Sequence, residues 1–514
     1  MRIWRQSLVA LWFVLTIGGW AQPIHLLVTG DMHGWLQGQQ VDGQMLGGAA
    51  EMMSCWQQIE HYQPHKDFLL LSCGDNVTGP ALATIFKGEP VIEVMNQMGY
   101  DVSVLGNHEF DYGRAQYDKW VKQAKFRFIV ANLVKADGTP SDMALPYVIC
   151  DNNGVKVGII GLITAAVAKI ASTDGQTTTP YAATLRKYVP EMRAQGAQVI
   201  VVLAHVPMNE LETLARQVKD LHIPLMLGGH SHELHQIQVA DTQTWVVNSG
   251  CWWRAYSRID LDYQAHTGNA VVQSCKQVWM QQEQAQANSE VQQSINNWQS
   301  RMGLSKPIIQ AGLGVQEIIN RWQMRMGAEY GVELGYTASG ITRPLTVVNF
   351  IGACYLGTDP GADVTLFNNG GFRQDITPGG ITKGVIVGVM PFTNQLYRIT
   401  VSGQQLLDYH APESSLYYGL RREDTQLVLM KTGQPIDPHA SYHLLITDYL
   451  YQNSPYLLAA DPHPVIAAAD YRQPVYDWLA RHPSNNTRAL ETIIDLKAPV
   501  LAVGKHLAEH APAH

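Results

Sequence analysis

Aspartate, histidine and asparagine recur in five short motifs whose residue types suit metal binding. Asp31 and His33 are separated by one residue, and so are His230 and His232. The motifs are, in chain order, Thr29-Gly30-Asp31-Met32-His33-Gly34, Cys73-Gly74-Asp75-Asn76, Gly106-Asn107-His108-Glu109-Phe110-Asp111, Ala204-His205-Val206-Pro207 and Gly228-Gly229-His230-Ser231-His232. Any one of them alone is typical of an ordinary loop. Five in order, each directly after an apolar run, predict a metal centre.

The ligand types indicate which ions and which chemistry the centre would support. Carboxylate and imidazole together suit Mn, Zn, Co or Fe, whereas an oxygen-only set suits Mg or Ca. Alternate residues leave a loop on the same side, so each Asp-x-His or His-x-His pair can share an ion. The neighbouring glycines let the backbone approach a charged centre without a Cβ clash. Two ions roughly 3.5–4 Å apart can activate a water between them and hold phosphoryl oxygens for in-line attack.

These motifs need strands that end at a common edge. Apolar runs rich in Val, Ile and Leu precede every motif, and their length is typical of strands buried on both faces. Helical stretches are expected between several of them, at 48–61 and 83–98. The pattern predicts an α/β fold with its site at the carboxyl ends of the strands. The expected strands are Ile24–Val28, Phe68–Ser72, Val102–Leu105, Val155–Ile160, Val199–Leu203, Leu225–Leu227 and Trp245–Val247.

The start of the chain is typical of an export signal. Arg2 and Arg5 precede an apolar run and then small residues at a cleavage position, which predicts a signal peptide at 1–21. The run is shorter than the roughly 20 residues that cross a bilayer. We therefore expect a periplasmic or secreted protein without a transmembrane segment in the mature chain; an uncleaved anchor is the alternative.

The length of 514 residues favours two or more domains. We expect a catalytic domain at 23–280, an amphipathic linker helix at 281–306, a second α/β or α+β domain at 307–498 and a loose tail at 499–514. A net charge of −8 without long runs of one sign argues against a nucleic-acid polymer or a membrane surface as partner. The six cysteines lack Cys-x-x-Cys spacing, which excludes a zinc ribbon. After export one or two disulfides can form, with Cys251 and Cys275 a candidate pair.

The chain resembles the calcineurin-like metallophosphoesterases and, more narrowly, the two-domain bacterial periplasmic 5′-nucleotidase and UDP-sugar hydrolase family. The resemblance extends from Ile24 to Leu496 and is most specific at Met95–Gly113, MNQMGYDVSVLGNHEFDYG. It implies a four-layer sandwich, with helices outside two central sheets, followed by a smaller C-terminal α/β nucleotidase domain. It also implies that Asp31, His33, Asp75 and His232 hold one metal, and that Asp75 bridges to a second held by Asn107, His205 and His230.

The resemblance further implies a catalytic pair. His108 would lie beside the leaving oxygen, stabilise charge on the phosphoryl oxygens and protonate the leaving group. Asp111 would orient the ring of His108 and raise its pKa. The alternative for Asp111 is a turn former ahead of Tyr112 and Gly113.

Substrate recognition is expected in the second domain. Arg373, in Asn368-Asn369-Gly370-Gly371-Phe372-Arg373, matches a ligand for phosphate or carboxylate, and Arg343 is a second candidate. Phe392 matches an aromatic that stacks on the base, Asn394 a residue that bonds its edge, and Tyr449 the second aromatic of the clamp. Core packing is the alternative for Phe392. The family's following Gly-Gly-Asp element, which contacts ribose, is replaced here by Gln452-Asn453-Ser454-Pro455.

The leading hypothesis is therefore a 5′-nucleotidase that releases phosphate from nucleotides through attack by a metal-bridging hydroxide. A cyclic-nucleotide phosphodiesterase, a nucleotide-sugar pyrophosphatase and a sulfur-compound hydrolase are alternatives within the superfamily. A non-catalytic nucleotide-binding protein is the alternative of a different class, and it predicts a lost ligand or a replaced His108. The altered element after Tyr449 also leaves a non-nucleotide substrate open.

Overall fold

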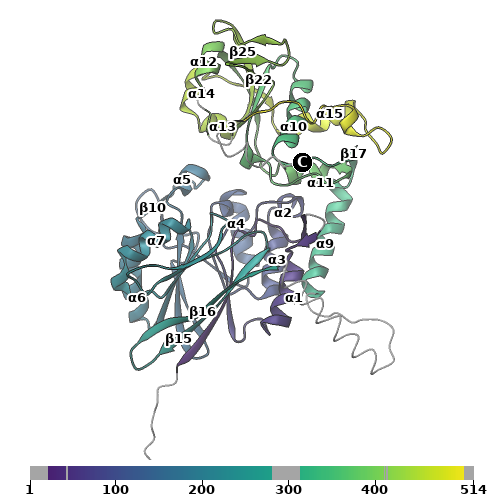
Figure 1. Ribbon diagram of the computed structural model, residues 1–514. Helices are drawn as coiled ribbons and strands as arrows, with labels where there is room; N and C mark the ends of the chain where they lie inside the picture. The colour runs from purple at the N-terminus through teal and green to yellow at the C-terminus, as the bar shows by residue number, and fades with distance from the viewer. Residues whose placement is uncertain (1–20, 42–43, 281–312, 410, 413–414, 503–514) are drawn as a thin grey trace, which may run out of the picture.

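The structure is a computed structural model that describes residues 21–41, 44–280, 313–409, 411–412 and 415–502. Figure 1 shows two bodies, one formed by the purple to teal half of the chain and a smaller one formed by the green to yellow half. The expected linker helix at 281–306, residues 1–20 of the expected signal peptide and residues 503–514 of the expected tail lie outside the described residues.

The N-terminal body contains two six-stranded sheets. The first has the order β16-β15-β1-β4-β5-β6, with β1 (Gln22–Thr29), β4 (Phe68–Ser72), β5 (Val102–Val104), β6 (Arg127–Ile129), β15 (Ala255–Gln264) and β16 (Asn269–Trp279). The second has the order β13-β14-β12-β11-β9-β8, with β8 (Tyr147–Asn152), β9 (Val155–Ile163), β11 (Val199–His205), β12 (Leu225–Gly228), β13 (Leu234–Gln238) and β14 (Trp245–Ser249). All seven expected strands are present: β4 has the expected bounds, β5 ends one residue earlier, and the other five extend by up to three residues at an end.

Helices cover the outer face of each sheet. An outer core on the first sheet includes side chains from α1 (Ala49–Ile59), α3 (Glu89–Met98), α4 (Gly113–Gln123) and α9 (Leu313–Tyr330). The outer core on the second sheet is formed with α6 (Tyr181–Ala194) and α7 (Met208–Gln217). Between the sheets lies a third core of aliphatic side chains such as Leu26, Leu71 and Val201. The expected four-layer sandwich is confirmed.

The strands that carry the motifs run parallel within their sheets. In the first sheet β1, β4, β5 and β6 are parallel, and in the second β9, β11, β12 and β14 are parallel. Their runs are buried on both faces, with every residue of Phe68–Ser72 and Val199–His205 buried. The motif loops therefore leave the carboxyl ends of neighbouring strands, where α/β proteins place their sites.

Two features of this body differ from expectation. The single helix expected at 83–98 is two helices, α2 (Ala81–Ile85) and α3, because Gly88 adopts a left-handed φ of 76° and Pro90 follows at the start of α3. The long antiparallel strands β15 and β16 were not predicted. Buried and partly exposed residues alternate along β15, and β16 is mostly exposed or partly exposed, so neither strand has the continuous apolar run that marked the other strands.

The C-terminal body is built on one sheet of order β26-β20-β25-β18-β21-β27. Its strands are β18 (Val364–Asn368), β20 (Leu396–Ser402), β21 (Ser415–Tyr418), β25 (Ser441–Thr447), β26 (Val465–Ala468) and β27 (Leu501–Ala502). The helices include α10 (Leu345–Thr358), α11 (Lys383–Val389), α13 (Asp448–Gln452), α14 (Pro455–Ala460) and α15 (Gln473–Arg481). The apolar run at Val385–Met390 is thus helical, and the expected smaller α/β domain is confirmed.

Helix α9 joins the two bodies although it precedes the second sheet. Val315, Ile319 and Trp322 pack into the outer core of the N-terminal body, against α1 and α3. The indole N–H of Trp322 donates to Glu93 on α3 at 2.9 Å. Figure 1 shows α9 rising along the N-terminal body to the C-terminal one. The domain boundaries stay a prediction, and α9 contacts elements of both bodies, α3 in the first and α11 in the second.

Two further expectations concern disulfide bonds and membrane-spanning helices. Cys251 and Cys275 both carry free thiols, so this candidate pair forms no disulfide in the structure. Within the described ranges, none of the helices combines the length and the apolar character that crossing a bilayer requires.

Candidate metal centre and active site

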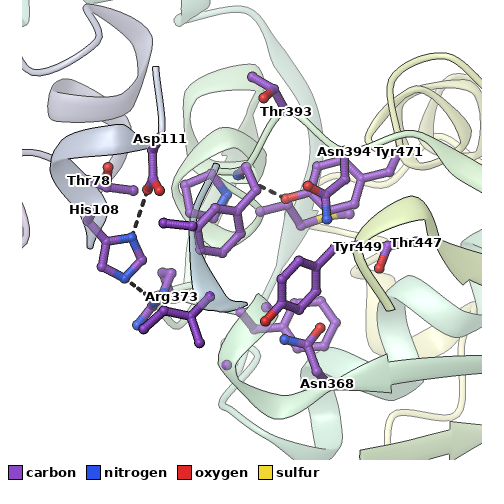
Figure 2. A pocket seen from close by; sticks show the side chains of 18 of the residues that line it. Thr78, His108, Asp111, Asn368, Arg373, Thr393, Asn394, Thr447, Tyr449 and Tyr471 are labelled. Atoms are coloured by element: carbon purple, nitrogen blue, oxygen red, sulfur yellow. Dashed lines mark hydrogen bonds and ion pairs between the residues drawn. The ribbon is translucent and has the colours of Figure 1, made fainter. Parts of the chain in front are cut away.

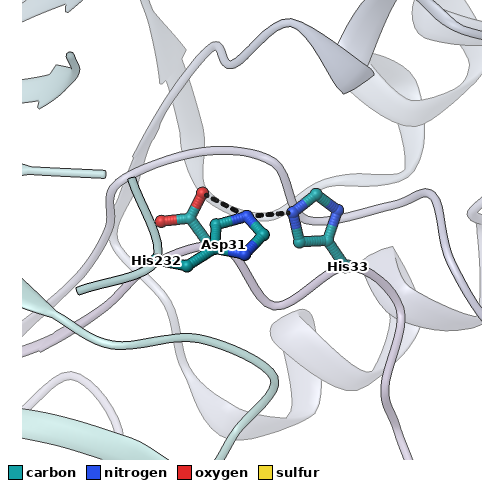
Figure 3. Close-up of side chains that lie close together, drawn as sticks. All are labelled: Asp31, His33 and His232. Carbon is teal, nitrogen blue, oxygen red and sulfur yellow. Dashed lines mark hydrogen bonds and ion pairs between the residues drawn. The ribbon is translucent and has the colours of Figure 1, made fainter. Parts of the chain in front are cut away.

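Three of the expected ligands converge from the two sheets at one end of the site. Asp31 and His33 follow β1, and His232 follows β12. Nε2 of His33 lies 2.9 Å from Nε2 of His232, and that nitrogen lies 3.6 Å from Oδ1 of Asp31. Figure 3 shows the three side chains pointing at a common centre. Their ligand atoms are all within 4.8 Å of one another, which is close enough to share a metal ion.

A second cluster lies beside the first and is formed by Asp75, His205 and His230. Nε2 of His205 lies 3.1 Å from Oδ2 of Asp75, 3.2 Å from Nδ1 of His230 and 3.3 Å from Oδ1 of Asn107. Oδ2 of Asp75 is also 3.8 Å from Nε2 of His33 in the first cluster. The carboxylate of Asp75 therefore stands between the two clusters, as a bridging ligand must.

Backbone carbonyls select the tautomers that metal binding needs. The Nδ1–H of His205 donates to the carbonyl oxygen of Cys73 at 2.8 Å, and the Nδ1–H of His33 donates to that of Thr78 at 3.2 Å. Each ring is thereby oriented with the lone pair of Nε2 facing the cluster. Metal-binding histidines commonly have such a partner on the far nitrogen.

Burial and charge suit a cationic occupant. Burial raises the pKa of Asp31 to about 7, and burial lowers the pKa of His230 and of His232 to about 4 and that of His33 well below its usual value. Three neutral imidazoles and two buried carboxylates thus face one space. Buried carboxylates are costly unless they are paired or coordinate a metal. The donor set of mixed N and O ligands fits two divalent ions of the Mn, Zn, Co or Fe type.

The backbone of the centre is held in an uncommon conformation. Five of the seven expected ligands have a left-handed φ: Asp31 (50°), His33 (44°), Asp75 (53°), His230 (74°) and His232 (58°). Positive φ is uncommon outside glycine and clusters at functional sites. The adjacent glycines allow the close approach that the sequence indicated. A Cβ on Gly106 would lie 2.2 Å from Oδ1 of Asp75, and one on Gly229 would lie 2.9 Å from the carbonyl oxygen of Cys73.

A buried carboxylate, Glu109, ties two of the ligand loops together. Its Oε2 accepts the backbone N–H of Asp75 at 2.9 Å and of Gly106 at 2.7 Å, and its Oε1 accepts the backbone N–H of Asn76 at 2.8 Å. The side chain is fully buried, and none of the ligand clusters among the described residues includes it. Glu109 instead fixes the positions of the loops that carry Asp75 and Asn107.

His108 borders the clusters on the side of the C-terminal body. Its Nδ1 lies 2.7 Å from Oδ2 of Asp111, and its Nε2 lies 4.0 Å from Oδ2 of Asp75. Burial by itself lowers the pKa of His108, but the charges of Asp111 and Asp75 outweigh it and raise the pKa above its usual value. Arg373 approaches from the other body, with Nη2 3.1 Å from Nε2 of His108.

A pocket of about 420 Å³ opens next to His108 between the two bodies. Phe392 and Tyr449 line it, and Tyr449 is 41% exposed. The ring of Phe392 lies 6.2 Å from that of His108 with an interplanar angle of 24°. Figure 2 shows Asn394 and Tyr449 facing the same space as Arg373. This interdomain pocket has the size and the mixed apolar and polar lining of a small-molecule site.

The sequence did not single out several residues of this region. Tyr471 lines the interdomain pocket, and its hydroxyl accepts the backbone N–H of Phe392 at 3.1 Å. Residues 170–172 of the N-terminal body also line the pocket. Neither segment carries a motif, so only their placement in three dimensions reveals them. Arg343 does not line the interdomain pocket; it lines a second cavity next to His33.

Known families match both bodies. Residues 24–234 match the Calcineurin-like phosphoesterase family, and residues 334–413 match the 5′-nucleotidase C-terminal domain. The chain is 25% identical over 507 residues to a cell wall protein of Listeria monocytogenes, covering 84% of this chain and 63% of that protein. It is 34% identical over 252 residues to a 2′,3′-cyclic-nucleotide 2′-phosphodiesterase/3′-nucleotidase of Haemophilus influenzae, covering 41% of this chain and 38% of that protein.

The fold is also found in solved structures. A 5′-nucleotidase precursor from Thermus thermophilus superposes with a TM-score of 0.72 at 21% identity, covering 90% of this chain and 97% of that one. The chain spans less than two thirds of the length of the two sequence relatives named above. The two family matches follow one another in the order of the two bodies. The chain belongs to the 5′-nucleotidase family, with a calcineurin-like phosphoesterase domain followed by a 5′-nucleotidase C-terminal domain.

Proposed function

We propose that the protein is a metal-dependent phosphoesterase that acts as a 5′-nucleotidase and releases phosphate from nucleotides. The observation that carries the proposal is the position of His108, between two metal-type clusters and a pocket that Phe392 and Tyr449 line. Asp31, His33, Asp75 and His232 would hold one ion, and Asp75, Asn107, His205 and His230 the other. Bound there, two divalent ions would supply an activated water and polarise the phosphoryl oxygens.

The residues of the chain then have distinct roles in the reaction. Arg373 would bind a phosphoryl oxygen through its guanidinium group. His108 would donate the proton from Nε2 to the leaving oxygen, while Asp111 holds the opposite nitrogen of the ring at 2.7 Å. Because Nη2 of Arg373 lies 3.1 Å from Nε2 of His108, these two side chains can act on the same phosphoryl group.

The interdomain pocket would hold the organic part of the substrate. Phe392 and Tyr449 would stack on a base, and Asn394 would bond its edge. Helix α13 begins at Asp448 and ends at Gln452, so the segment that replaces the Gly-Gly-Asp element continues from this helix into α14. Ribose binding must therefore use other groups, of which Thr447 and Asn368 line the pocket.

A phosphate-release screen tests the proposal. Nucleoside monophosphates, cyclic nucleotides and UDP-sugars are assayed with Mn²⁺, with EDTA in parallel and the His108→Ala variant as control. Turnover of monophosphates that EDTA abolishes supports the nucleotidase. Preferred turnover of cyclic nucleotides or UDP-sugars would favour the phosphodiesterase or pyrophosphatase, and binding without turnover of any substrate would favour a non-catalytic protein. If Phe392→Ala and Tyr449→Ala leave the KM for nucleotides unchanged, the stacking clamp is wrong.

We further propose that the protein is exported after cleavage at residue 21. The basic start and the apolar run at the N-terminus support this, and one relative is named a cell wall protein. Expression of the full chain followed by cell fractionation and N-terminal sequencing tests it. A mature chain that starts at Gln22 outside the cytoplasm supports export, and an intact Met1 in the cytoplasm contradicts it.

A further inference from the structure

A second cavity, which we call the tryptophan cavity, opens beside the candidate metal centre. It has a volume of about 260 Å³ and is lined by residues that include His33, Trp35, Trp252, Arg343, Phe372 and Arg373. Arg373 and Phe372 also line the interdomain pocket, so the two cavities meet at these side chains. His33 belongs to the first metal cluster, whereas Asn107 and His108 line the interdomain pocket. A group bound at the centre can therefore extend in two directions.

The turn that carries Trp252 is strained in a way that the core does not explain. The backbone N–H of Arg254 bonds to the carbonyl oxygen of Cys251 at 3.1 Å, which closes a turn with Trp252 (φ 60°) and Trp253 (φ 58°) at its centre. Turns with two positive φ values strongly favour Gly, Asn and Asp. Trp253 is 1% exposed and packs in the core, where its ring lies 6.2 Å from that of Tyr100. Trp252 is only half-buried, so burial does not account for an indole there.

The contacts of Trp252 point to the metal centre instead. Its ring lies 5.8 Å from the ring of His232 and 6.2 Å from that of Trp35. Its backbone N–H donates to the carbonyl oxygen of Asp31 at 2.9 Å. The turn is thereby fixed to two expected ligands of the first cluster, and its indole forms a wall of the cavity. Strained residues of this kind concentrate at binding and catalytic sites.

Arg343 adds a guanidinium group to the lining of the tryptophan cavity. Its Nε bonds to Asp375 at 3.0 Å, and its Nη1 donates to the carbonyl oxygen of Phe372 at 3.4 Å. Its side chain is 30% exposed, which leaves the remaining guanidinium donors facing the cavity or solvent. Planar rings stack on indoles, and guanidinium groups bind the oxygen atoms that such rings carry. The cavity thus suits a planar ring with polar oxygens.

A monoester has one organic arm, which the interdomain pocket would hold next to His108. A second cavity beside the same metal centre gives a second substituent on the phosphorus a place to bind. We propose that the tryptophan cavity is a binding subsite for the second, ring-bearing arm of a phosphate diester. This inference rests on the proposed function. Water would form a new P–O bond while the P–O bond to the first arm breaks. His108 would donate a proton to the leaving oxygen and regain one from the attacking water, and the second arm stays on the resulting monoester.

Two chromogenic substrates with the same leaving group separate the subsite from the chemistry. p-Nitrophenyl phosphate has one arm, and bis(p-nitrophenyl) phosphate carries a second planar arm with oxygen atoms. Initial rates are measured with Mn²⁺ for the wild type, Trp35→Ala, Trp252→Ala and Arg343→Gln. We expect the diester-to-monoester ratio of kcat/KM to fall about tenfold in each variant, the size of a lost aromatic or charged contact. Trp252→Phe retains a ring and should retain most of the ratio.

The matched control is Trp279→Ala, since Trp279 ends β16 and is 53% exposed away from both cavities. It should leave the ratio at the wild-type value. The subsite is overturned if no cavity variant alters the diester-to-monoester ratio of kcat/KM. It is also overturned if Trp279→Ala lowers this ratio as much as the cavity variants do. Thermal unfolding of each variant shows that it is folded, and Trp35→Ala and Arg343→Gln keep the test intact should Trp252→Ala unfold.

A binding measurement distinguishes failure of the subsite from failure of the proposed function. Calorimetric titration of bis(p-nitrophenyl) phosphate into the Mn²⁺-loaded His108→Ala protein needs no turnover. We expect affinity to fall about tenfold when Trp35→Ala is added. If the wild type hydrolyses neither substrate but Trp35→Ala still lowers the affinity for the diester, the proposed phosphoesterase activity is wrong and the subsite stands. If the wild type hydrolyses the monoester but Trp35→Ala leaves the affinity for the diester unchanged, the enzyme activity stands and the subsite is wrong.

Discussion

Arg373 lies with its Nη2 3.1 Å from Nε2 of His108, although 265 positions separate the two residues along the chain. The first belongs to the C-terminal body and the second to the N-terminal body, so the two side chains meet across the interface. Arg373 also places its guanidinium carbon 5.4 Å from the centre of the Phe392 ring. A phosphoryl group bound between the clusters and the interdomain pocket would thus contact side chains of both bodies.

This contact predicts that Arg373→Lys weakens substrate binding. Lysine keeps the charge but loses the planar fork that binds two phosphoryl oxygens. We expect kcat/KM for a nucleoside monophosphate to fall by about 10- to 100-fold, mostly through KM. Arg398→Lys is the control, because Arg398 pairs with Asp359 at 2.9 Å away from the lining of the interdomain pocket. Equal kinetics of Arg373→Lys and the wild type would remove Arg373 from the phosphate site.

The pairing of His108 with Asp111 predicts a loss of turnover in Asp111→Asn. The amide cannot accept the Nδ1–H of His108 as strongly as the carboxylate does, so the ring loses its orientation and its charged partner. We expect kcat to fall by about 100-fold with a smaller change in KM. Asp118→Asn, at an exposed position on α4, is the matched control. Should Asp111 be only a turn former, the variant would lower the melting temperature and leave kcat close to wild type.

The hydrogen bonds of Glu109 predict that replacing this residue weakens metal binding rather than proton transfer. Glu109→Gln keeps the shape but offers one acceptor oxygen where the carboxylate serves three backbone N–H groups. Loss of such an outer support typically costs 10- to 100-fold in metal affinity. Titration against a fluorescent chelator measures the affinity for Mn²⁺ and Zn²⁺, with the exposed Glu210→Gln as control. Activity lost at saturating metal with unchanged metal affinity would contradict this role.

The sequence predicted the N-terminal body well because its strands are buried on both faces. Continuous apolar runs such as Phe68–Ser72 mark such strands directly. The same pattern failed at β15, where buried and partly exposed residues alternate, and at α2 and α3, where Gly88 breaks a run that the sequence predicts as one helix. Local pattern therefore identified the parallel strands that carry the motifs but not the antiparallel strands β15 and β16 or the exact helix breaks.

The site was predictable to the extent that its residues lie in motifs. Asp31 and Asp75 follow strands that lie side by side, so their convergence follows from the parallel sheet. Tyr471 and Trp252 reach the site through the packing of distant segments, and no local spacing indicates them. Arg343 was expected to contact the substrate, and the structure places it in a different cavity from Phe392.

The stability of the C-terminal body is expected to depend on Glu491 and on pH. Glu491 accepts hydrogen bonds from the Thr337 hydroxyl at 2.6 Å and from the backbone N–H and hydroxyl of Ser339 at 2.8 and 2.7 Å. Burial opposes the charge, but these bonds outweigh it and lower the pKa of Glu491 to about 2. Because the pKa in the folded state is lowered, the stabilisation is complete above the unfolded pKa of roughly 4.3. It is lost as the pH falls from there towards 2.

Glu491→Gln should therefore lower the free energy of unfolding by about 1 kcal/mol at pH 7, a value discounted for the partial exposure of the carboxylate. The difference between variant and wild type should shrink below about pH 4. Calorimetry of the full chain at pH 7 and pH 3.5 measures it, and the transition of the C-terminal body should move while that of the N-terminal body stays. Glu423→Gln, whose carboxylate is 53% exposed beside Arg421, should change neither transition. A destabilisation of equal size at both pH values would show that the charge of Glu491 is not what stabilises this loop.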